Sequence, residues 1–288
     1  MSGFELVHPS SLQEAVAILA AGDPSVRPFS GGTALMLMMK AGVFQPSRLV
    51  NLRGVGAQYN QVSVTASGGL HIGALATLAS LEHSMEVLHY APVIRHAMKR
   101  LANVRVRNVA RVGGALAHGD PHMDLPPVLA SLGAEAIIAG PSGERRAAVE
   151  SLYTGYYETV LEPGELIAGV DVPSQAGWSS AYLKTTTRSA DDWPAVGVAV
   201  SVRRESDAIA ECRLVVSAAT EKLSRLTNAE AELRKRVIDG AVLSRVADAA
   251  AAEAETISDT RGSAAYKSQL LRVQLRRALL QAVKEQVQ

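Results

Sequence analysis

The sequence predicts an α+β protein in two parts: a mixed front part up to about Pro173, and a back part in which a sheet precedes helices. In the front part, short apolar segments of strand type alternate with segments of helical period. From Trp178 onward, three segments of strand type follow one another directly, as in an antiparallel meander, and long alanine-rich helices come after them. We therefore expect a C-terminal three-stranded antiparallel sheet with helices.

The first helix of the front part carries the clearest end signals. Ser11 with Glu14 three residues later matches a capping box, and Ala15, Ile18 and Leu19 form one apolar stripe. The other elements expected in the front part are strands at 27–30 and 47–52, helices at 33–42, 92–102 and 124–131, a hairpin within 61–77 and a strand ending at 140. The elements expected in the back part are strands at 178–187, 194–204 and 209–219 and helices at 228–254 and 264–287.

Charge and cysteine content exclude several classes of function. There are 29 lysines and arginines against 28 aspartates and glutamates, so a formal net charge of +1 gives no electrostatic attraction for nucleic acid or an anionic membrane. The apolar runs are too short to cross a bilayer, and we expect no signal peptide. The single cysteine, Cys212, excludes an internal disulfide, a thiolate-bound iron–sulfur cluster and a structural zinc site in this chain. We expect a cytoplasmic protein.

The stretch FSGGTALMLMMK, residues 29–40, places two glycines between a predicted strand and a predicted helix. Glycine allows positive φ and close approach of a ligand to the backbone, and a helix N-terminus offers free N–H groups and partial positive charge. Gly31 and Gly32 therefore suit a phosphate or diphosphate, and Ser30 and Thr33 add hydroxyl donors. The alternative is an ordinary strand-to-helix turn with Thr33 as its cap.

A second glycine pair stands in RVGGALAHGDPHMDLPPVL, residues 111–129. Residue types that bind metal ions follow this pair at alternate positions, namely His118, Asp120, His122 and Asp124. The turn predicted by Gly119 and Pro121 argues against placing all four on one face, so no metal site is expected. A polar loop in which Asp124 caps the next helix is the other structural interpretation.

Neither standard nucleotide-binding signature is complete. RGVGAQYN, residues 53–60, begins like the G-x-G-x-x-G fingerprint, but the third glycine is missing and no apolar helix follows. The chain also has no G-x-x-x-x-G-K-[ST] loop. The glycine pairs therefore indicate a nucleotide site of neither the Rossmann nor the P-loop type.

Taken in order, the two glycine motifs resemble those of the FAD-binding medium subunits of the molybdenum hydroxylases. This family includes xanthine dehydrogenase, carbon monoxide dehydrogenase, and bacterial nicotine and quinoline oxidoreductases. The resemblance extends to FELVHPSSLQEAVAILA, EPGELIAGVDVP and AYLKTTTRSADDWPAVGVAV, and thus covers essentially the whole chain. It implies the two-subdomain FAD-binding fold of the p-cresol methylhydroxylase and vanillyl-alcohol oxidase type, with subdomains at 1–57 and 58–173 and a C-terminal domain at 174–288.

The resemblance also assigns cofactor contacts. Both glycine loops would surround the FAD diphosphate, the backbone of Leu166 and Ile167 would meet the flavin ring, and Lys184 would lie near the ring and favour its reduced, anionic form. The residues assigned to FAD are Ser30, Gly31, Gly32, Thr33, Ala34, Arg111, Val112, Gly113, Gly114, His118, Asp120, Asp124, Leu166, Ile167 and Lys184. Arg111 stands where the family usually has Thr or Ser, and its guanidinium could donate to the diphosphate. No residue is expected to be catalytic by itself.

The family implies an electron-transfer function. A large subunit with a molybdopterin cofactor would oxidise the substrate, two [2Fe-2S] clusters in a small subunit would carry the electrons to FAD, and an external acceptor would receive them. The chains would form a dimer of heterotrimers that hydroxylates an N-heteroaromatic compound such as quinoline. The alternatives are a free-standing FAD-dependent reductase of the same fold type and a flavin-free scaffold subunit, and the two intact glycine pairs argue against the scaffold.

For a few residues, a role in packing or at the surface is the alternative to a role at the cofactor. Met36, Met38 and Met39 are interpreted as helix packing, and Cys212 as part of a strand core. Trp193 either shields the flavin or packs, and Lys184 is either a cofactor ligand or a solvated strand residue.

Overall fold

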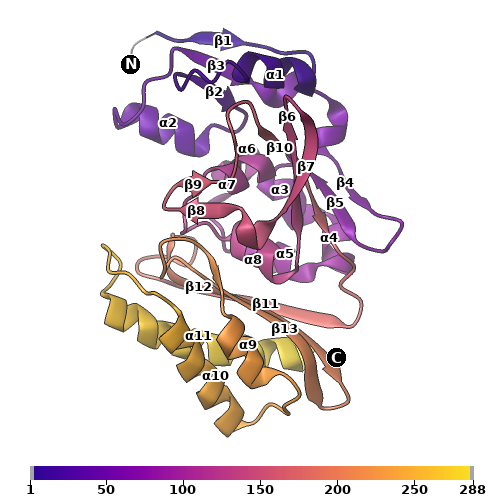
Figure 1. Ribbon diagram of the computed structural model, residues 1–288, viewed down its shortest axis with the longest axis vertical. Helices are drawn as coiled ribbons and strands as arrows, with labels where there is room; N and C mark the ends of the chain where they lie inside the picture. The colour runs from indigo at the N-terminus through magenta and orange to yellow at the C-terminus, as the bar shows by residue number, and fades with distance from the viewer. Residues whose placement is uncertain (1–2, 286–288) are drawn as a thin grey trace.

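The computed structural model describes residues 3–285, and the chain forms three parts that follow one another from one end of the molecule to the other (Figure 1). The first part is a parallel sheet of order β1-β3-β2 with two helices. Its elements are β1 (Glu5–Val7), α1 (Leu12–Leu19), β2 (Val26–Phe29), α2 (Thr33–Lys40) and β3 (Arg48–Asn51). Two short 3₁₀ turns, at Leu52–Gly54 and Ala57–Asn60, stand where the incomplete G-x-G-x-x-G segment lies.

The start of α1 confirms the predicted capping signal. The Ser11 hydroxyl accepts a hydrogen bond from the Glu14 backbone N–H at 3.1 Å. The Glu14 carboxylate reaches back to Ser10, whose backbone N–H donates to it at 2.8 Å. Two N–H groups at the helix N-terminus are thereby satisfied.

The middle part is built on an antiparallel sheet of order β4-β5-β10-β6-β7, and the predicted hairpin is its β4–β5 edge. The strands are β4 (Val62–Val64), β5 (Leu70–Gly73), β6 (Glu135–Gly140), β7 (Gly143–Ala148) and β10 (Leu166–Val172). The helices are α3 (Leu78–His83), α4 (Met85–Tyr90), α5 (Pro92–Lys99), α6 (Val104–Val109), α7 (Val112–Ala117) and α8 (Leu125–Ser131). A small separate hairpin joins β8 (Tyr153–Gly155) to β9 (Glu158–Thr159).

The C-terminal sheet has four strands, so the prediction of three is corrected. The predicted meander is present as β11 (Trp178–Thr186), β12 (Pro194–Glu205) and β13 (Ala208–Ser217). The added strand, β14 (Ser224–Arg225), pairs with Val215 and Val216 of β13. Two residues are too few to show a strand periodicity, which is why the sequence did not reveal this strand.

Strand β12 is buried on both faces, which explains its long apolar sequence. Val198 and Val200 belong to the core beneath the C-terminal helices, whereas Ala199 belongs to the core of the middle part. The helices α9, α10 and α11 lie on the outer side of the sheet (Figure 1). The C-terminal sheet therefore packs between its own helices and the middle part.

The helix predicted at 228–254 is two helices, and that prediction is corrected. They are α9 (Thr227–Leu233) and α10 (Gly240–Glu253). Lys235 adopts a left-handed φ of 59° between them, and its N–H donates to the Ile209 carbonyl at 2.7 Å. The last helix, α11 (Ala264–Glu285), begins where predicted, and the predicted end at Val287 lies outside the described residues.

Glu230 in α9 is expected to be essential for the stability of the C-terminal part. It is fully buried, and its carboxylate accepts hydrogen bonds from Arg225 at 2.8 and 3.0 Å and from the Leu214 N–H at 3.0 Å. Glu230→Ala leaves these donors without their acceptor and should lower the free energy of unfolding by about 3–5 kcal/mol in urea denaturation. Glu232→Ala, on the exposed side of the same helix, is the control and should change it little. Equal stability of the two variants would contradict the assignment.

Candidate cofactor site

The two glycine motifs meet in the folded chain. A Cβ atom at Gly31 would lie 2.3 Å from the carbonyl oxygen of Val109 and 2.9 Å from Cα of Ala110, so only glycine allows this approach. Gly32, the residue before α2, has a φ of 70°, and a Cβ there would lie 2.4 Å from the Phe29 ring. The first motif is thus packed directly against the segment that leads into the second.

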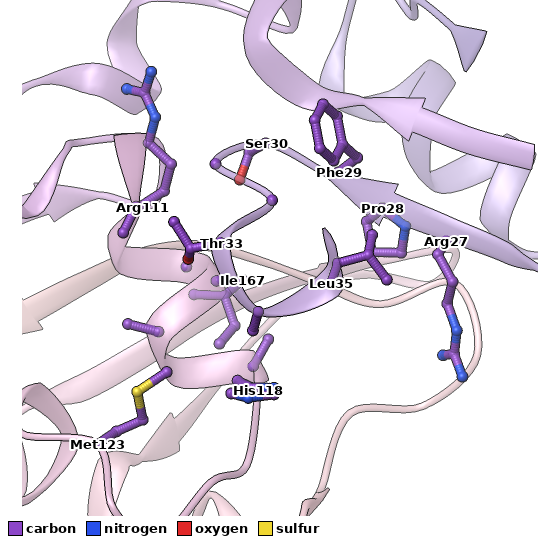
Figure 2. Close-up of a pocket in the computed structure, with 18 of the residues that line it drawn as sticks. Arg27, Pro28, Phe29, Ser30, Thr33, Leu35, Arg111, His118, Met123 and Ile167 are labelled. Atoms are coloured by element: carbon purple, nitrogen blue, oxygen red, sulfur yellow. The ribbon is translucent and has the colours of Figure 1, made fainter. Parts of the chain in front are cut away.

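One cavity of about 950 Å³ lies along both motifs. Figure 2 shows side chains from both motifs, among them Ser30, Thr33, Arg111 and His118, around this cavity. The predicted residues that line it are Ser30, Gly31, Gly32, Thr33, Ala34, Arg111, Gly113, Gly114, His118, Asp124, Leu166 and Ile167. Residues of the C-terminal domain close one side of the cavity, namely Ser189, Asp191, Asp192 and Trp193.

The cavity wall contains groups that suit a diphosphate. Helix α2 starts at the cavity after Gly32 with no side chain capping it, and α7 likewise has no side-chain cap. Helix N-termini without a cap present backbone N–H donors and partial positive charge to an anion. Gly114 is exposed, and a Cβ on it would meet no atom within 4 Å. A side chain at Gly114 would extend from the wall into the open space of the cavity, and glycine keeps this space free for a ligand. The free helix N-termini and this open space together suit a bound dinucleotide.

Gly113 lines the cavity and also has a packing role, whereas Val112 lies behind the wall. A Cβ on Gly113 would lie 2.9 Å from Cβ of Ala74, and its N–H donates to the Ala74 carbonyl at 2.8 Å. Val112 is fully buried, does not line the cavity, and donates its N–H to Ala76. The glycine pair thus has two different reasons: Gly113 allows close packing on β5, and Gly114 keeps the wall open.

The Arg111 guanidinium does not extend toward Thr33 in this structure (Figure 2). It donates to the Leu75 carbonyl at 2.5 Å and to the Asn60 side chain at 3.3 Å. Its Nε is buried without a hydrogen-bond partner, and burial lowers the pKa of the guanidinium. In this structure Arg111 lines the cavity and fastens the second motif to the segment before α3, and its donation to a diphosphate stays a prediction.

Of the four polar residues after the second motif, His118, His122 and Asp124 line the cavity and Asp120 does not. The Asp120 carboxylate accepts from the His122 backbone N–H at 2.9 Å and from the Tyr157 hydroxyl at 3.1 Å. Within residues 3–285, no group of three or more His, Cys, Asp or Glu side chains is arranged to hold a metal ion. Asp124 lies at the N-terminus of α8, as expected, but its side chain makes no capping hydrogen bond there.

Asp124 instead forms a buried cluster with two residues of β11. The Tyr182 hydroxyl donates to Oδ1 of Asp124 at 2.6 Å, and Nζ of Lys184 lies 3.1 Å from Oδ2. Burial raises the pKa of Asp124, and the Lys184 ammonium and the Tyr182 hydroxyl oppose that rise. Lys184 also donates to the Asp192 carbonyl at 2.9 Å. This bond fixes the loop that brings Trp193 to the cavity.

The expected position of Lys184 is therefore corrected. Its side chain is 1% exposed and lies behind Asp124, not on the cavity wall. The prediction of alternation along β11 was right, since Tyr182 and Lys184 both contact Asp124. The alternative of a solvated surface lysine is wrong as well. Met39 and Cys212 are buried, as expected for packing residues. Met36 and Met38 are only half-buried, and Met38 lines the cavity, where Trp193 remains 46% exposed.

Tyr157 is a cavity residue that the sequence did not single out. It follows β8 in the small hairpin with a left-handed φ of 60°, and its ring lies edge-on to the His118 ring with centroids 5.0 Å apart. Its N–H donates to the Gly119 carbonyl at 3.0 Å. No local pattern identifies such a residue, because its role depends on a loop 38 positions earlier in the chain.

Two protein families match this chain and together span most of its length. Residues 2–175 match the FAD binding domain in molybdopterin dehydrogenase, and residues 181–282 match the CO dehydrogenase flavoprotein C-terminal domain. The chain belongs to the FAD-binding medium subunits of the molybdenum hydroxylases. The α+β fold and the family expected from the sequence are thereby confirmed.

Several relatives match this medium subunit over nearly its whole length. It is 32% identical to the carbon monoxide dehydrogenase medium chain of Afipia carboxidovorans, over 97% of this chain and 96% of that one. The carbon monoxide dehydrogenase structure from Hydrogenophaga pseudoflava superposes with a TM-score of 0.94 at 31% identity, covering 98% and 97% of the two chains. Quinoline 2-oxidoreductase from Pseudomonas putida 86 superposes with a TM-score of 0.91 at 29% identity, covering 98% of each chain.

FAD is thus the cofactor of this medium subunit, and when bound it supplies the redox chemistry that the side chains themselves lack. The start of α2 and the open wall at Gly114 would hold its diphosphate, while Leu166 and Ile167 form an apolar part of the cavity. Among residues 3–285, no helix is both long and apolar enough to cross a membrane.

Gly114 offers a test of the diphosphate site that leaves the fold intact. Gly114→Val should lower FAD content several-fold, because the new side chain occupies the cavity while its own surroundings are free of contacts. Absorbance of the purified medium subunit at 450 nm and circular dichroism measure cofactor and fold. Gly240→Val is the control, since Gly240 is equally open but lies at the start of α10. Full flavin content in Gly114→Val would contradict the assignment, whereas Gly32→Val would be uninformative because it strains the fold.

Lys184→Met should destabilise the folded chain. It leaves the Asp124 carboxylate buried without its cation and should lower the free energy of unfolding by about 3–5 kcal/mol. The double variant Asp124→Leu with Lys184→Met should lose less than the sum of the single variants, because neither partner is left alone. Urea denaturation of the four proteins measures this coupling. Additive effects would show that the two side chains do not interact.

Proposed function

We propose that this medium subunit is the FAD-carrying electron-transfer subunit of a multi-subunit molybdenum hydroxylase. The observation that carries the proposal is a single cavity of about 950 Å³, in which both glycine motifs and the Trp193 loop form the walls. All of the fifteen assigned residues except Val112, Asp120 and Lys184 line it. These three act from behind the wall, by packing or by hydrogen bonds to residues that line it.

The partners follow from what this chain lacks. Its one cysteine, Cys212, is buried in β13, and burial raises the pKa of its thiol to about 12. A thiolate-bound cluster therefore has to lie in another chain. We propose a small subunit with two [2Fe-2S] clusters, a large subunit with the molybdopterin cofactor, assembly as a dimer of heterotrimers, and release of the electrons to an external acceptor. Relatives named as medium chains are in accord with this division.

The substrate of the complex belongs to the large subunit. An N-heteroaromatic compound such as quinoline is the proposed substrate class, and the similarity to quinoline 2-oxidoreductase is in accord with it. Carbon monoxide dehydrogenase is an equally similar relative, so the class is best decided on the assembled complex. A free-standing FAD-dependent reductase remains the second candidate for the chain itself.

Expression of the medium subunit alone and together with its neighbouring reading frames tests the proposal. The isolated chain should contain FAD, become reduced by dithionite and be reoxidised by an artificial acceptor such as a tetrazolium dye, without turnover of any organic substrate. The co-expressed complex should copurify and reduce its flavin with the substrate of the large subunit. Substrate oxidation by the isolated chain would favour the free-standing reductase, and an isolated chain without flavin would favour the scaffold.

A further inference from the structure

A chain of polar side chains, of which Asp120, His122 and Lys267 are buried, connects the cavity with the C-terminal helices. Tyr157 donates to Asp120, Asp120 contacts His122, His122 contacts Asp259, and Asp259 pairs with Lys267 of α11. The Nζ atom of Lys267 lies 2.7 Å from Oδ2 of Asp259. The members come from the β8–β9 hairpin, the loop after α7, the loop before α11 and α11 itself. One continuous path therefore joins the cavity wall to the start of α11.

The cavity end of this path is held in a strained conformation. Tyr157 keeps its left-handed φ of 60° through a backbone bond to Gly119 and the bond from its hydroxyl to Asp120. Non-glycine residues in this region persist where their surroundings hold them. The Asp120 carboxylate is therefore what fixes the Tyr157 ring, and the His118 ring next to it, along the cavity.

His122 occupies the middle of the path with a carboxylate on each ring nitrogen. Nδ1 lies 2.9 Å from Asp120 and Nε2 lies 3.2 Å from Asp259, and the residue is 5% exposed. A neutral imidazole has one N–H, so it can donate to only one of these carboxylates. Only the imidazolium donates to both and completes the path.

Charged and titratable groups surround His122 on both sides of its ring. Asp120 contacts it from its own loop, with His118 and Tyr157 next to Asp120. Asp259 contacts it from the other side, where Asp259 also bonds to Lys267 and to the backbone N–H of Arg261. Burial of Asp259 is outweighed by hydrogen bonds from Lys267, the Arg261 backbone and His122, which lower its pKa to about 2. The hydrogen bonds from His122 likewise lower the pKa of Asp120 against its burial. Both neighbours of the ring are therefore carboxylates.

We propose that His122 is a positioning residue for FAD, which acts through Asp120 on Tyr157 and completes the cavity wall only as an imidazolium. The inference rests on the FAD site of this chain and goes beyond it, because it makes the affinity for FAD depend on pH. When the ring loses its second proton, one of its two contacts with a carboxylate is lost and the wall loosens. A less ordered wall binds the cofactor more weakly.

The full chain, stripped of flavin and titrated with FAD, tests this proposal. The dissociation constant, measured by quenching of FAD fluorescence between about pH 5 and pH 9, should rise about fivefold from the acidic to the alkaline end of this range, because only the imidazolium of His122 donates to both carboxylates. His122→Gln should bind FAD at the weaker level at every pH, because glutamine carries no titrating proton. His89→Gln, at an exposed histidine of α4 that does not line the cavity, should retain the pH step.

Lys267→Met distinguishes a positioning role of His122 from a general loss of structure in the His122 variant. Without the ammonium, the negative charge of Asp259 is no longer neutralised and holds the imidazolium more firmly, so the step in affinity should move to higher pH. Nitrogen-15 spectra of the histidine rings in the flavin-free protein follow the same titration directly, with the His122 signals assigned by their absence in His122→Gln. This second measurement decides the question if Lys267→Met does not fold.

Two results would overturn the inference: an FAD affinity of the unmodified protein that is constant over this range, or a pH step that survives in His122→Gln. A protein that binds no FAD at any pH would instead contradict the cofactor assignment. Tight binding without a pH step would leave that assignment intact.

Discussion

The packing of Gly31 against the backbone of Val109 and Ala110 is the contact on which the site depends. A Cβ atom at this position would lie 2.3 Å from a carbonyl oxygen, so any other residue would push the N-terminal part away from the middle part. Because Gly31 packs directly against this backbone, the start of α2 and the wall at Gly114 border the same cavity. Two short motifs about 80 residues apart thereby become one binding surface, with donors from the first and open space from the second.

The C-terminal domain shapes the same cavity through buried polar contacts. Lys184 ties Asp124 to the Asp192 carbonyl, and His122 ties Asp120 to Asp259. Buried charges of this kind add little net stability compared with apolar packing, but each is costly when its partner is removed. Their effect is to define one relative position of the parts. The cavity is therefore a property of the whole chain and not of the FAD-binding domain alone.

Local patterns predicted most of the secondary structure, and the reasons for the misses are specific. The capping box at Ser11, the hairpin of β4 and β5 and the meander of the back part are present because they rest on nearest-neighbour spacing. The break at Lys235 was missed because it is set by a hydrogen bond to Ile209 in another strand. The two-residue strand β14 exists only through its pairing with β13.

By itself, the sequence indicated the fold class through the spacing of its apolar residues, and the family through the resemblance of its two glycine motifs, taken in order, to those of the FAD-binding medium subunits. Only the tertiary structure decided which way the polar side chains point. Lys184 faces Asp124, Arg111 faces Leu75, and Tyr157 reaches Asp120 from a separate hairpin. The physical reason is that a buried charge or hydroxyl must be satisfied by whichever partner lies within about 3 Å, and that partner is brought there by the fold and not by the neighbouring sequence.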